Sequence, residues 1–537
     1  MRVLRASWPA LAIIVLGLAP FLDKAFTIDD TLFLRVAEHA LVEPLSPMAF
    51  TYAWAETPER MSALLANGPL GGYLLVPTLL AGGAEWVAHL TWWALLAVAV
   101  LSTVSLGLRI GLPSLHAGFA GVLVVAAPAV LTLASTNMPD VPALALGTLG
   151  MERLFAWRRE QRWHQAAAAA LALGLAPLAR SQAILLWPLA ALVPFLDVAE
   201  RRSWRAFVPW KLAPVITLPV ILWVATRLTA DPEHTGAFLE TIRRFTIWGG
   251  QNSVAWFVQY ALTMPLVPWL AFRLRDARWW WAVPLAAGIA WAWPQLPPAY
   301  GWQRFVFAPF AGFTAVALAD MCVDAWRRRD LARFILVGWA LISLPIVIYV
   351  HMSAKYFVPS APAIALLVAL AAREVSDRSV RPIMVASAAV GLVFGLLIVS
   401  ADARYADLGR RAAAELIAPR VAQGQQVWFA GHWGFQWYAE RAGARVITRQ
   451  PPQPRPGDAI VSGTNLHGMR LVRLFPNRQR VTSIVERRPG GRVMSSGAGF
   501  WSNAWGFLPW TWGQDVVEQF DLWQLPTEGD TGTAVPE

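Results

Sequence analysis

The sequence has few of the residues that enzymes use for redox, metal or nucleotide chemistry. It contains one cysteine in 537 residues, Cys322, so a disulfide framework and a cysteine-based metal site are both excluded. His432 and His467 have no partner at the spacing of metal ligands. No Walker-type phosphate loop occurs, and no Gly-x-Gly-x-x-Gly follows a strand, so nothing in the sequence indicates nucleotide binding.

Charged residues are also scarce, at 15% of the chain, whereas 56% of residues are hydrophobic and the mean hydropathy is +0.45. Long apolar runs recur, each near the roughly 20 residues that a helix needs to cross a bilayer. The 30 tryptophans agree with this reading, because indole rings are favoured at the membrane–water interface. The composition therefore predicts an α-helical polytopic membrane protein.

About 13 transmembrane helices are expected from the apolar runs. The first run, residues 7–22, lacks a small-x-small cleavage site and is followed by further spans, so we expect it to remain as the first helix. Residues 68–80 are apolar but too short to cross, and we expect them at the interface or in a re-entrant segment. The spans are placed near residues 8–25, 84–107, 116–134, 140–157, 164–180, 182–198, 208–228, 253–272, 279–294, 304–322, 333–350, 354–372 and 382–401.

The arginines predict the orientation of these helices. Five loops on one side of the predicted topology carry three or more arginines each, which indicates the cytoplasmic side and accounts for most of the net charge of +11. The N-terminus is then cytoplasmic, and an odd number of spans places the C-terminus outside. The loops are residues 157–163, 200–205, 273–278, 326–333 and 373–381.

The chain changes character after Ser400. Residues 1–401 are expected to form the transmembrane domain, and residues 402–537 a small extracytoplasmic α/β domain, because the second part has no membrane run. Three segments read as strands, 425–430, 444–449 and 458–463, and residues 432–443 read as a helix ended by glycine. The aromatic residues of this part are either a stacking platform for sugars or, as we favour, core and interfacial side chains.

Three aspartates lie at outer ends of predicted spans. Asp29 and Asp30 begin a long outer loop, residues 26–67, and Asp140 lies at the outer end of another span. Acids at membrane depth cost free energy unless they are paired or face an aqueous cavity, so they are candidate functional groups. Two adjacent carboxylates repel, which suits a general base or a metal ligand. A purely structural role remains open for the pair, and N-terminal helix capping remains open for Asp140.

Several cations are predicted on the same outer face. Arg180 lies in a short turn, and Arg304 and Lys355 lie at span ends. Arg243 and Arg244 lie in the outer loop near residues 229–252. Fixed cations beside a membrane suit a lipid phosphate, whereas the alternative is a side chain that reaches towards the lipid headgroups, which we favour for Arg304.

Five stretches stand out by their order and by their predicted side of the membrane. They are IDDTLFLRVAEHAL (28–41), NGPLGGYLLVPTLLAGG (67–83), MPDVPALALGTLGMERLFAW (138–157), LARSQAILLWPLAAL (178–192) and KYFVPSAPAIALLVA (355–369). Together they resemble the GT-C class of membrane glycosyltransferases, in the branch with protein O-mannosyltransferases, aminoarabinose transferases of lipid A and lipopolysaccharide core transferases. The resemblance covers roughly residues 1–400.

The resemblance implies a polyprenyl-phosphate sugar as donor and inverting transfer at the periplasmic face of a bacterial inner membrane. It places Asp29 as catalytic base with Asp30 where the family has Glu, and Asp140 as the second outer acid. It implies phosphate contacts for Arg180, Lys355 and Tyr356, with Arg304 as a further candidate. Asn67, Gly68 and Pro69 stand where the family has Lys-Pro-Pro. A divalent metal would have Asp29, Asp30 and Asp140 as candidate ligands.

Two other classes of membrane protein are alternatives for this sequence. A transporter or lipid flippase would explain many spans, but such proteins usually show two matching halves and ionisable residues near the midplane, whereas the acids here lie at span ends. A polymerase or ligase of lipid-linked glycans would be expected to depend on arginines in a long outer loop. The sequence leaves the sugar open, and also whether the acceptor is a lipid, a glycan or a protein.

Overall fold

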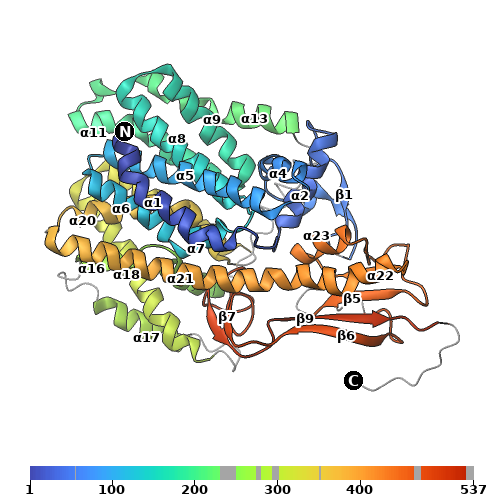
Figure 1. Ribbon diagram of the computed structural model, residues 1–537. Helices are drawn as coiled ribbons and strands as arrows, with labels where there is room; N and C mark the ends of the chain where they lie inside the picture. Colours follow the sequence, from blue (N-terminus) through green and yellow to red (C-terminus); the bar gives the residue numbers. More distant parts are fainter. Residues whose placement is uncertain are drawn as a thin grey trace.

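The computed structural model describes residues 1–54, 56–229, 249–273, 280–292, 301–349, 352–375, 377–464 and 473–527. A bundle of helices forms most of the molecule, and a small mixed sheet lies at one end of it (Figure 1). The predicted fold class, a helical polytopic membrane protein with a small C-terminal α/β part, is confirmed.

The long helices of the bundle are apolar on nearly all sides, as expected for helices packed in a membrane. Within the described residues, eight helical segments are long and apolar enough to cross a bilayer, or nine if a bent pair counts as one span. The main helices are α1 (Arg2–Leu18), α5 (Glu85–Arg109), α6 (Ser114–Ala126), α7 (Pro128–Leu133), α8 (Asp140–Glu160), α9 (Trp163–Ala179), α10 (Leu186–Leu192), α11 (Leu196–Arg201), α12 (Ala213–Ile216), α13 (Leu218–Thr229), α15 (Gly249–Thr263), α16 (Val267–Arg273), α17 (Ala282–Ala292), α18 (Gln303–Arg328), α19 (Leu331–Ala340), α20 (Ala361–Ala372) and α21 (Asp377–Ala412).

Helical structure is found at each of the 13 predicted spans, but several of them are broken. The predicted span 116–134 is divided between α6 and α7 because Pro128 cannot continue the hydrogen-bond ladder. The predicted span 354–372 begins as a tight 3-10 segment, Ala354–Ser360, before α20. The number of membrane crossings therefore stays a prediction.

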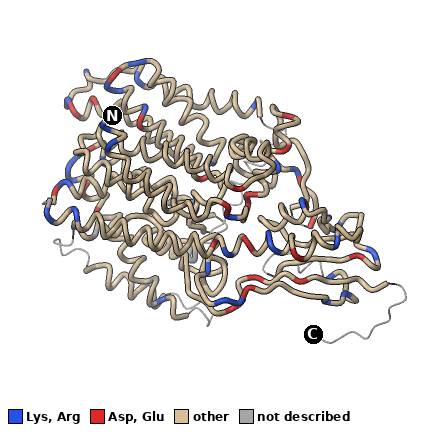
Figure 2. The backbone as a smooth tube through the Cα atoms, viewed as in Figure 1, with Lys and Arg blue, Asp and Glu red and all other residues tan. Residues whose placement is uncertain are grey.

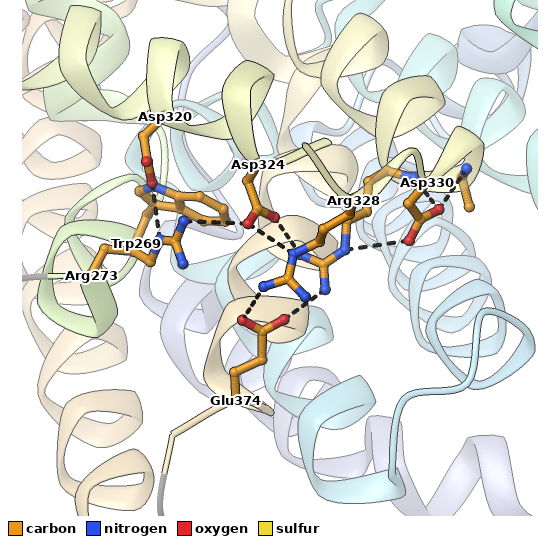
Figure 3. Close-up of polar contacts among 9 residues, drawn as sticks. Trp269, Arg273, Asp320, Asp324, Arg328, Asp330 and Glu374 are labelled. Carbon is orange, nitrogen blue, oxygen red and sulfur yellow. Dashed lines mark hydrogen bonds and ion pairs between the residues drawn. The ribbon is translucent and has the colours of Figure 1, made fainter. Parts of the chain in front are cut away.

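Ion pairs fasten the helices at the end of the bundle away from the sheet, where Figure 2 shows Lys and Arg gathered. The carboxylate of Asp324 on α18 receives three arginines, Arg273 at 3.3 Å, Arg328 at 2.9 Å and Arg333 at 2.7 Å. Arg328 and Arg333 also reach Glu374, beyond the end of α20 (Figure 3). Arginines of two predicted Arg-rich loops thus join α16, α18, α19 and the end of α20.

The outer loop after α1 folds into two helices of its own. Helix α2 (Asp30–Val42) follows the two aspartates, and α4 (Leu70–Leu80) packs across it. A short hairpin, β1 (Thr51–Tyr52) with β2 (Glu59–Arg60), and α3 (Met61–Leu64) lie between them. Helix α4 has 11 residues, so it is too short to cross, as the sequence predicted for residues 68–80.

The C-terminal part is built on a five-stranded sheet in the order β4-β3-β5-β9-β6. Strand β3 is parallel to β4 and β5, whereas β9 is antiparallel to β5 and β6. The three predicted strands and the predicted helix are confirmed as β3, β4, β5 and α23. The elements are β3 (Val427–Ala430), α23 (Gly434–Arg441), β4 (Arg445–Val446), β5 (Ala459–Gly463), β6 (Gln479–Glu486), β7 (Gly490–Arg492), β8 (Thr511–Gly513) and β9 (Glu518–Gln524), after a π-type turn at Ala413–Ile417 and α22 (Ala418–Ala422).

No break in the helix marks the predicted domain boundary at residues 401 and 402. Helix α21 continues through it to Ala412, and at about 1.5 Å per residue its 36 residues extend about 54 Å. The helix leaves the bundle and lies against the sheet part (Figure 1). The division into residues 1–401 and 402–537 therefore stays a proposal, based on composition and not on a break in the chain.

A close backbone approach joins the sheet part to the outer loop. A Cβ atom placed on Gly434 would lie 1.9 Å from the carbonyl oxygen of Phe26, so only glycine fits at the start of α23. The hydroxyl of Thr31 donates to the carbonyl of Trp433, and the amide of Phe26 donates to the hydroxyl of Tyr438. The loop that carries the two aspartates is thus packed directly against the C-terminal part.

Candidate active site

A tight turn at residues 27–30 carries the two predicted aspartates, which have different partners. Ile28 has φ +45°, an unusual conformation for a β-branched residue. The amide of Asp30 donates to the carbonyl of Thr27, which closes the turn just before α2. Strained backbone of this kind persists where the surroundings fix it, and here the side chain of Asp30 does so.

Asp30 is fully buried and binds backbone. One of its carboxylate oxygens accepts from the amide of Thr27 at 2.9 Å, and the other accepts from the amide of Asn137 at 3.0 Å. Burial raises the pKa of this carboxyl from 3.8 to about 7, against the lowering effect of Lys24 and the two amides. Asp30 therefore joins the first outer loop to the segment before Asp140, and both of its oxygens are already used.

Asp29 is the exposed member of the pair. Its side chain is 30% exposed, and one carboxylate oxygen lies 3.3 Å from Nζ of Lys355. Lys355 lies on the 3-10 segment before α20, far away in the sequence, and its side chain is 11% exposed. The structure thus brings together the first and the last of the five sequence motifs at one ion pair.

The ring of Tyr356 lies close to both predicted phosphate-binding cations. The guanidinium carbon of Arg180 lies 4.7 Å from the centre of its ring, and Nζ of Lys355 lies 5.8 Å from it. The amide of Gln182 donates to the carbonyl of Tyr356 at 3.1 Å, which joins the Arg180 turn to the Lys355 segment. Cation–π contacts hold cations in place without neutralising them, so the ring of Tyr356 helps to fix the positions of both cations.

Asp140 pairs with Arg180 and does not act as a helix cap. Oδ1 of Asp140 lies 2.7 Å from Nη1 of Arg180, and no side-chain capping bond is formed at the start of α8. Oδ2 of Asp140 is buried and accepts no hydrogen bond, and both polar atoms of the Asn137 side chain are likewise without a partner in the described part of the chain. The capping alternative is therefore not what the structure shows.

Arg304, the other predicted outer cation within the described residues, is not brought to this site. Nε of Arg304 donates to the carbonyl of Gly301, and its side chain lines an apolar groove between α17 and α18 with Phe305 and Ala286. This position agrees with a side chain that reaches towards the lipid headgroups. Arg243 and Arg244 lie outside the described residues.

The three aspartates do not form a metal site in this arrangement. Asp30 gives both oxygens to backbone amides, Asp140 is paired with Arg180, and Asp29 is paired with Lys355. Among the residues that the structure describes, no three His, Cys, Asp or Glu side chains are grouped so that they could hold a metal ion. The donor set of the described residues therefore does not fit a divalent cation.

A buried ion pair behind the site was missed in the sequence. Nζ of Lys24 lies 2.7 Å from Asp402, both side chains are fully buried, and Lys24 also donates to the carbonyl of Ser135. The indole of Trp501 donates to the other oxygen of Asp402 at 2.8 Å. Lys24 and Asp402 each lie at the outer end of a predicted span. Two opposite charges at these positions could have predicted the pair from the sequence.

The aromatic residues of the C-terminal part are mainly core. Trp437, Phe435, Phe500 and Trp501 are all at most 4% exposed, which supports the core interpretation over a sugar-stacking platform. His432 is packed against Trp54 and Trp433. His467 lies outside the described residues.

No family model and no curated protein matches the chain by sequence. Solved structures do match. ArnT from Cupriavidus metallidurans bound to undecaprenyl phosphate aligns with a TM-score of 0.53 at 15% identity, over 89% of this chain and 96% of that chain. ArnT in the apo state gives 0.52 at 13% identity, over 89% and 95%. The arabinofuranosyltransferase AftD from mycobacteria gives 0.45 at 14% identity, over 99% of this chain and 40% of that chain.

The match to ArnT extends over nearly the whole of both chains, C-terminal part included. The chain is a multi-pass membrane protein with a GT-C-like fold, so the resemblance stated from the five motifs is confirmed at the level of the fold.

Proposed function

We propose that this protein is an inverting glycosyltransferase that moves a sugar from a polyprenyl-phosphate donor to an acceptor hydroxyl. Transfer takes place on the extracytoplasmic side of the membrane, where the bilayer meets water. Asp29 is the catalytic base, and Lys355 and Arg180 bind the donor phosphate. Support for the donor class comes from the fold shared with ArnT, which was solved bound to undecaprenyl phosphate. We further propose a bacterial inner membrane, with the N-terminus in the cytoplasm and the C-terminal part in the periplasm, as the positive-inside rule predicts.

The observation that carries this proposal is the ion pair between Asp29 and Lys355. A partly exposed carboxylate lies beside Lys355, and both Lys355 and Arg180 lie close to the ring of Tyr356. A phosphate that binds Lys355 would take the place of the carboxylate as its partner. Donor binding would then release Asp29 to act as a base at the position where the acceptor must approach.

The chemistry needs no further group. The acceptor oxygen attacks the anomeric carbon, the bond from that carbon to the phosphate oxygen breaks, and the acceptor proton passes to Asp29. The released polyprenyl phosphate carries negative charge, which Lys355 and Arg180 stabilise. A single displacement inverts the anomeric configuration. Asp30 has no part in these steps, because both of its oxygens hold backbone amides.

Arg180 also accounts for the missing Lys-Pro-Pro of the second motif. A Cβ atom on Gly68 would lie 2.6 Å from the carbonyl oxygen of Leu178, so the Asn67–Pro69 segment lies against the turn that carries Arg180. The hydroxyl of Ser181 donates to the carbonyl of Ala66 at 3.4 Å, in the same place. A cation from the Arg180 turn therefore stands beside the segment from which the family's lysine would come.

The test is transfer by purified protein in lipid nanodiscs, with a panel of radiolabelled undecaprenyl-phosphate sugars and a bacterial envelope extract as acceptor. Asp29→Asn is expected to lower kcat at least a hundredfold, within the usual range for loss of a general base, without a change in thermal stability. Asp23→Asn is the matched control, because Asp23 is exposed in the same loop. Transfer that survives in Asp29→Asn would contradict the mechanism, and lipid flipping without transfer would favour the transporter alternative.

A further inference from the structure

A segment of the C-terminal part returns from the sheet to the membrane bundle beside Lys355. It lies in the long connection between β7 and β8, and we refer to residues 497–503 as the C-terminal clamp. Figure 1 shows β7 below α21, next to the bundle and apart from the five-stranded sheet. Strands β7 and β8 pair with each other, so the connection leaves and rejoins the fold at one place.

The clamp binds the backbone immediately before Lys355. The amide of Ala354 donates to the carbonyl of Phe500 at 2.9 Å, and the hydroxyl of Ser353 donates to the same carbonyl at 3.1 Å. Asn503 binds Met352 twice. Its side-chain Oδ1 accepts from the backbone amide of Met352 at 2.9 Å, and its backbone amide donates to the carbonyl of Met352 at 2.8 Å. Three consecutive residues before Lys355 are thus held by the clamp.

The clamp is itself fixed to two helices of the bundle. Nδ2 of Asn503 donates to the side chain of Asn252 on α15 at 2.9 Å. Gln259 on α15 donates to the carbonyl of Gly499, and Gln303 at the start of α18 donates to the carbonyl of Gly497. All three partner side chains on the bundle are at most 2% exposed, and the two bonds from the glutamines are buried. Hydrogen bonds from residues 497–503 of the C-terminal part therefore form a frame that holds the turn before Lys355.

We propose that the C-terminal clamp sets the position of the Lys355 ammonium group, and that Asn503 is its main positioning residue. This rests on the proposed function of Lys355 as a phosphate ligand. The side chain of Asn503 joins α15 to the backbone of Met352. Asn503 touches neither Asp29 nor Arg180, so it acts through Lys355. The C-terminal part is then a structural component of the active site.

The first arm of the test needs no substrate. Hydrogen–deuterium exchange is measured on peptides that cover residues 349–357 in wild type, Asn503→Ala and Asn503→Asp, together with thermal unfolding of each protein. Asn503→Asp keeps the acceptor for the Met352 amide and loses the donor to Asn252, so it is expected to retain most of the protection. Asn503→Ala is expected to lose at least tenfold protection there, with the peptides of α5 unchanged. Asn477→Ala is the matched control, because Asn477 lies in an exposed turn.

The second arm asks whether Asn503 acts through Lys355. Binding of undecaprenyl phosphate and transfer rate are measured for Asn503→Ala, Lys355→Met and the double variant. Asn503→Ala alone is expected to lower donor affinity about tenfold, and to have almost no further effect once Lys355 is gone. Effects that multiply in the double variant would overturn the positioning role, as would unchanged exchange at residues 349–357.

The two arms separate this proposal from the proposed function. If the wild type neither binds undecaprenyl phosphate nor transfers sugar, the proposed function fails, while the exchange arm still decides whether the clamp orders the Lys355 turn. If Asn503→Ala does not fold, Asn503→Ser, which loses both the Oδ1 acceptor and the Nδ2 donor, takes its place in the double-variant cycle with the same criterion.

Discussion

Lys24 and Asp402 form a fully buried ion pair 2.7 Å long that joins the first outer loop to the last long helix. Trp501 from the C-terminal clamp donates to the same carboxylate, and Lys24 also binds the carbonyl of Ser135. The ion pair and its two hydrogen bonds therefore connect four parts of the chain: the loop with Asp29, the segment before Asp140, helix α21 and the clamp. The active-site residues make none of these bonds, yet their relative positions depend on them.

Removal of one partner of this buried pair is expected to be strongly destabilising. Lys24→Met leaves the Asp402 carboxylate uncompensated in the interior, which should cost about 3–5 kcal/mol of unfolding free energy. Scanning fluorimetry in detergent measures the resulting fall in the thermal midpoint of unfolding. Glu415→Gln is the control, because it breaks an exposed pair with Arg411 that should contribute less than about 1 kcal/mol. Equal effects of the two substitutions would show that burial has no bearing on this pair.

The buried Asp30 carboxyl should make stability depend on pH. Its pKa of about 7 in the folded protein lies above the ordinary value of 3.8, so the folded state binds more protons between these values. Stability is then greatest at low pH and falls as the pH rises from about 4 to 7, by an amount on the order of a few kcal/mol. Thermal midpoints at pH 5 to 8 should fall for wild type and stay flatter for Asp30→Asn. Parallel profiles would contradict this assignment.

Gly434 should tolerate no side chain. In Gly434→Ala the new Cβ would meet the carbonyl of Phe26, so the C-terminal part cannot pack against the aspartate loop. We expect a lower thermal midpoint, faster proteolysis between residues 413 and 434, and loss of most transfer activity. Gly17→Ala is the control, because a Cβ there meets nothing within 4 Å. Normal proteolysis of Gly434→Ala would show that the loop and α23 can separate without consequence.

Arg180 should not be replaceable by lysine. Lysine keeps the charge but loses the planar group that lies over Tyr356 and reaches Asp140, so the cation is no longer held in place. For Arg180→Lys we expect the KM for the lipid donor to rise about tenfold, with a smaller change in kcat. Steady-state kinetics measure this beside Arg445→Lys, a change at an exposed strand position. Unchanged donor KM would remove Arg180 from the phosphate site.

Much of the fold could be predicted because apolar runs and arginine-rich loops are local signals. The candidate site was predicted in part. Asp29, Arg180, Lys355 and Tyr356 do come together, but Asp30 lies in a different environment from Asp29 although the two are adjacent. Their difference depends on the amide of Asn137, which only the folded structure brings to Asp30. No pattern in the sequence near Asp30 carries that information.

The C-terminal part shows a second reason for missed predictions. Strand β6 has mostly exposed residues, and β9 buries Glu518 and Asp521, so neither shows the apolar alternation of a half-buried strand. The clamp was missed because it binds largely through backbone carbonyls, such as that of Phe500, which any residue could supply. Composition reveals side-chain chemistry, whereas this contact depends on the path of the chain.

The path of the clamp also determines when during synthesis the active site can form. A ribosome makes Asp29 first and Lys355 only after most helices of the bundle have been made. The clamp residues near Asn503 follow later still, after strands β3 to β7 of the C-terminal part. The membrane helices can be inserted before that point, but the turn that carries Lys355 lacks its hydrogen-bonded frame until the clamp arrives. If Lys355 binds the donor as proposed, a nascent chain already in the membrane would remain inactive until the clamp residues have been made and have packed against the Lys355 turn.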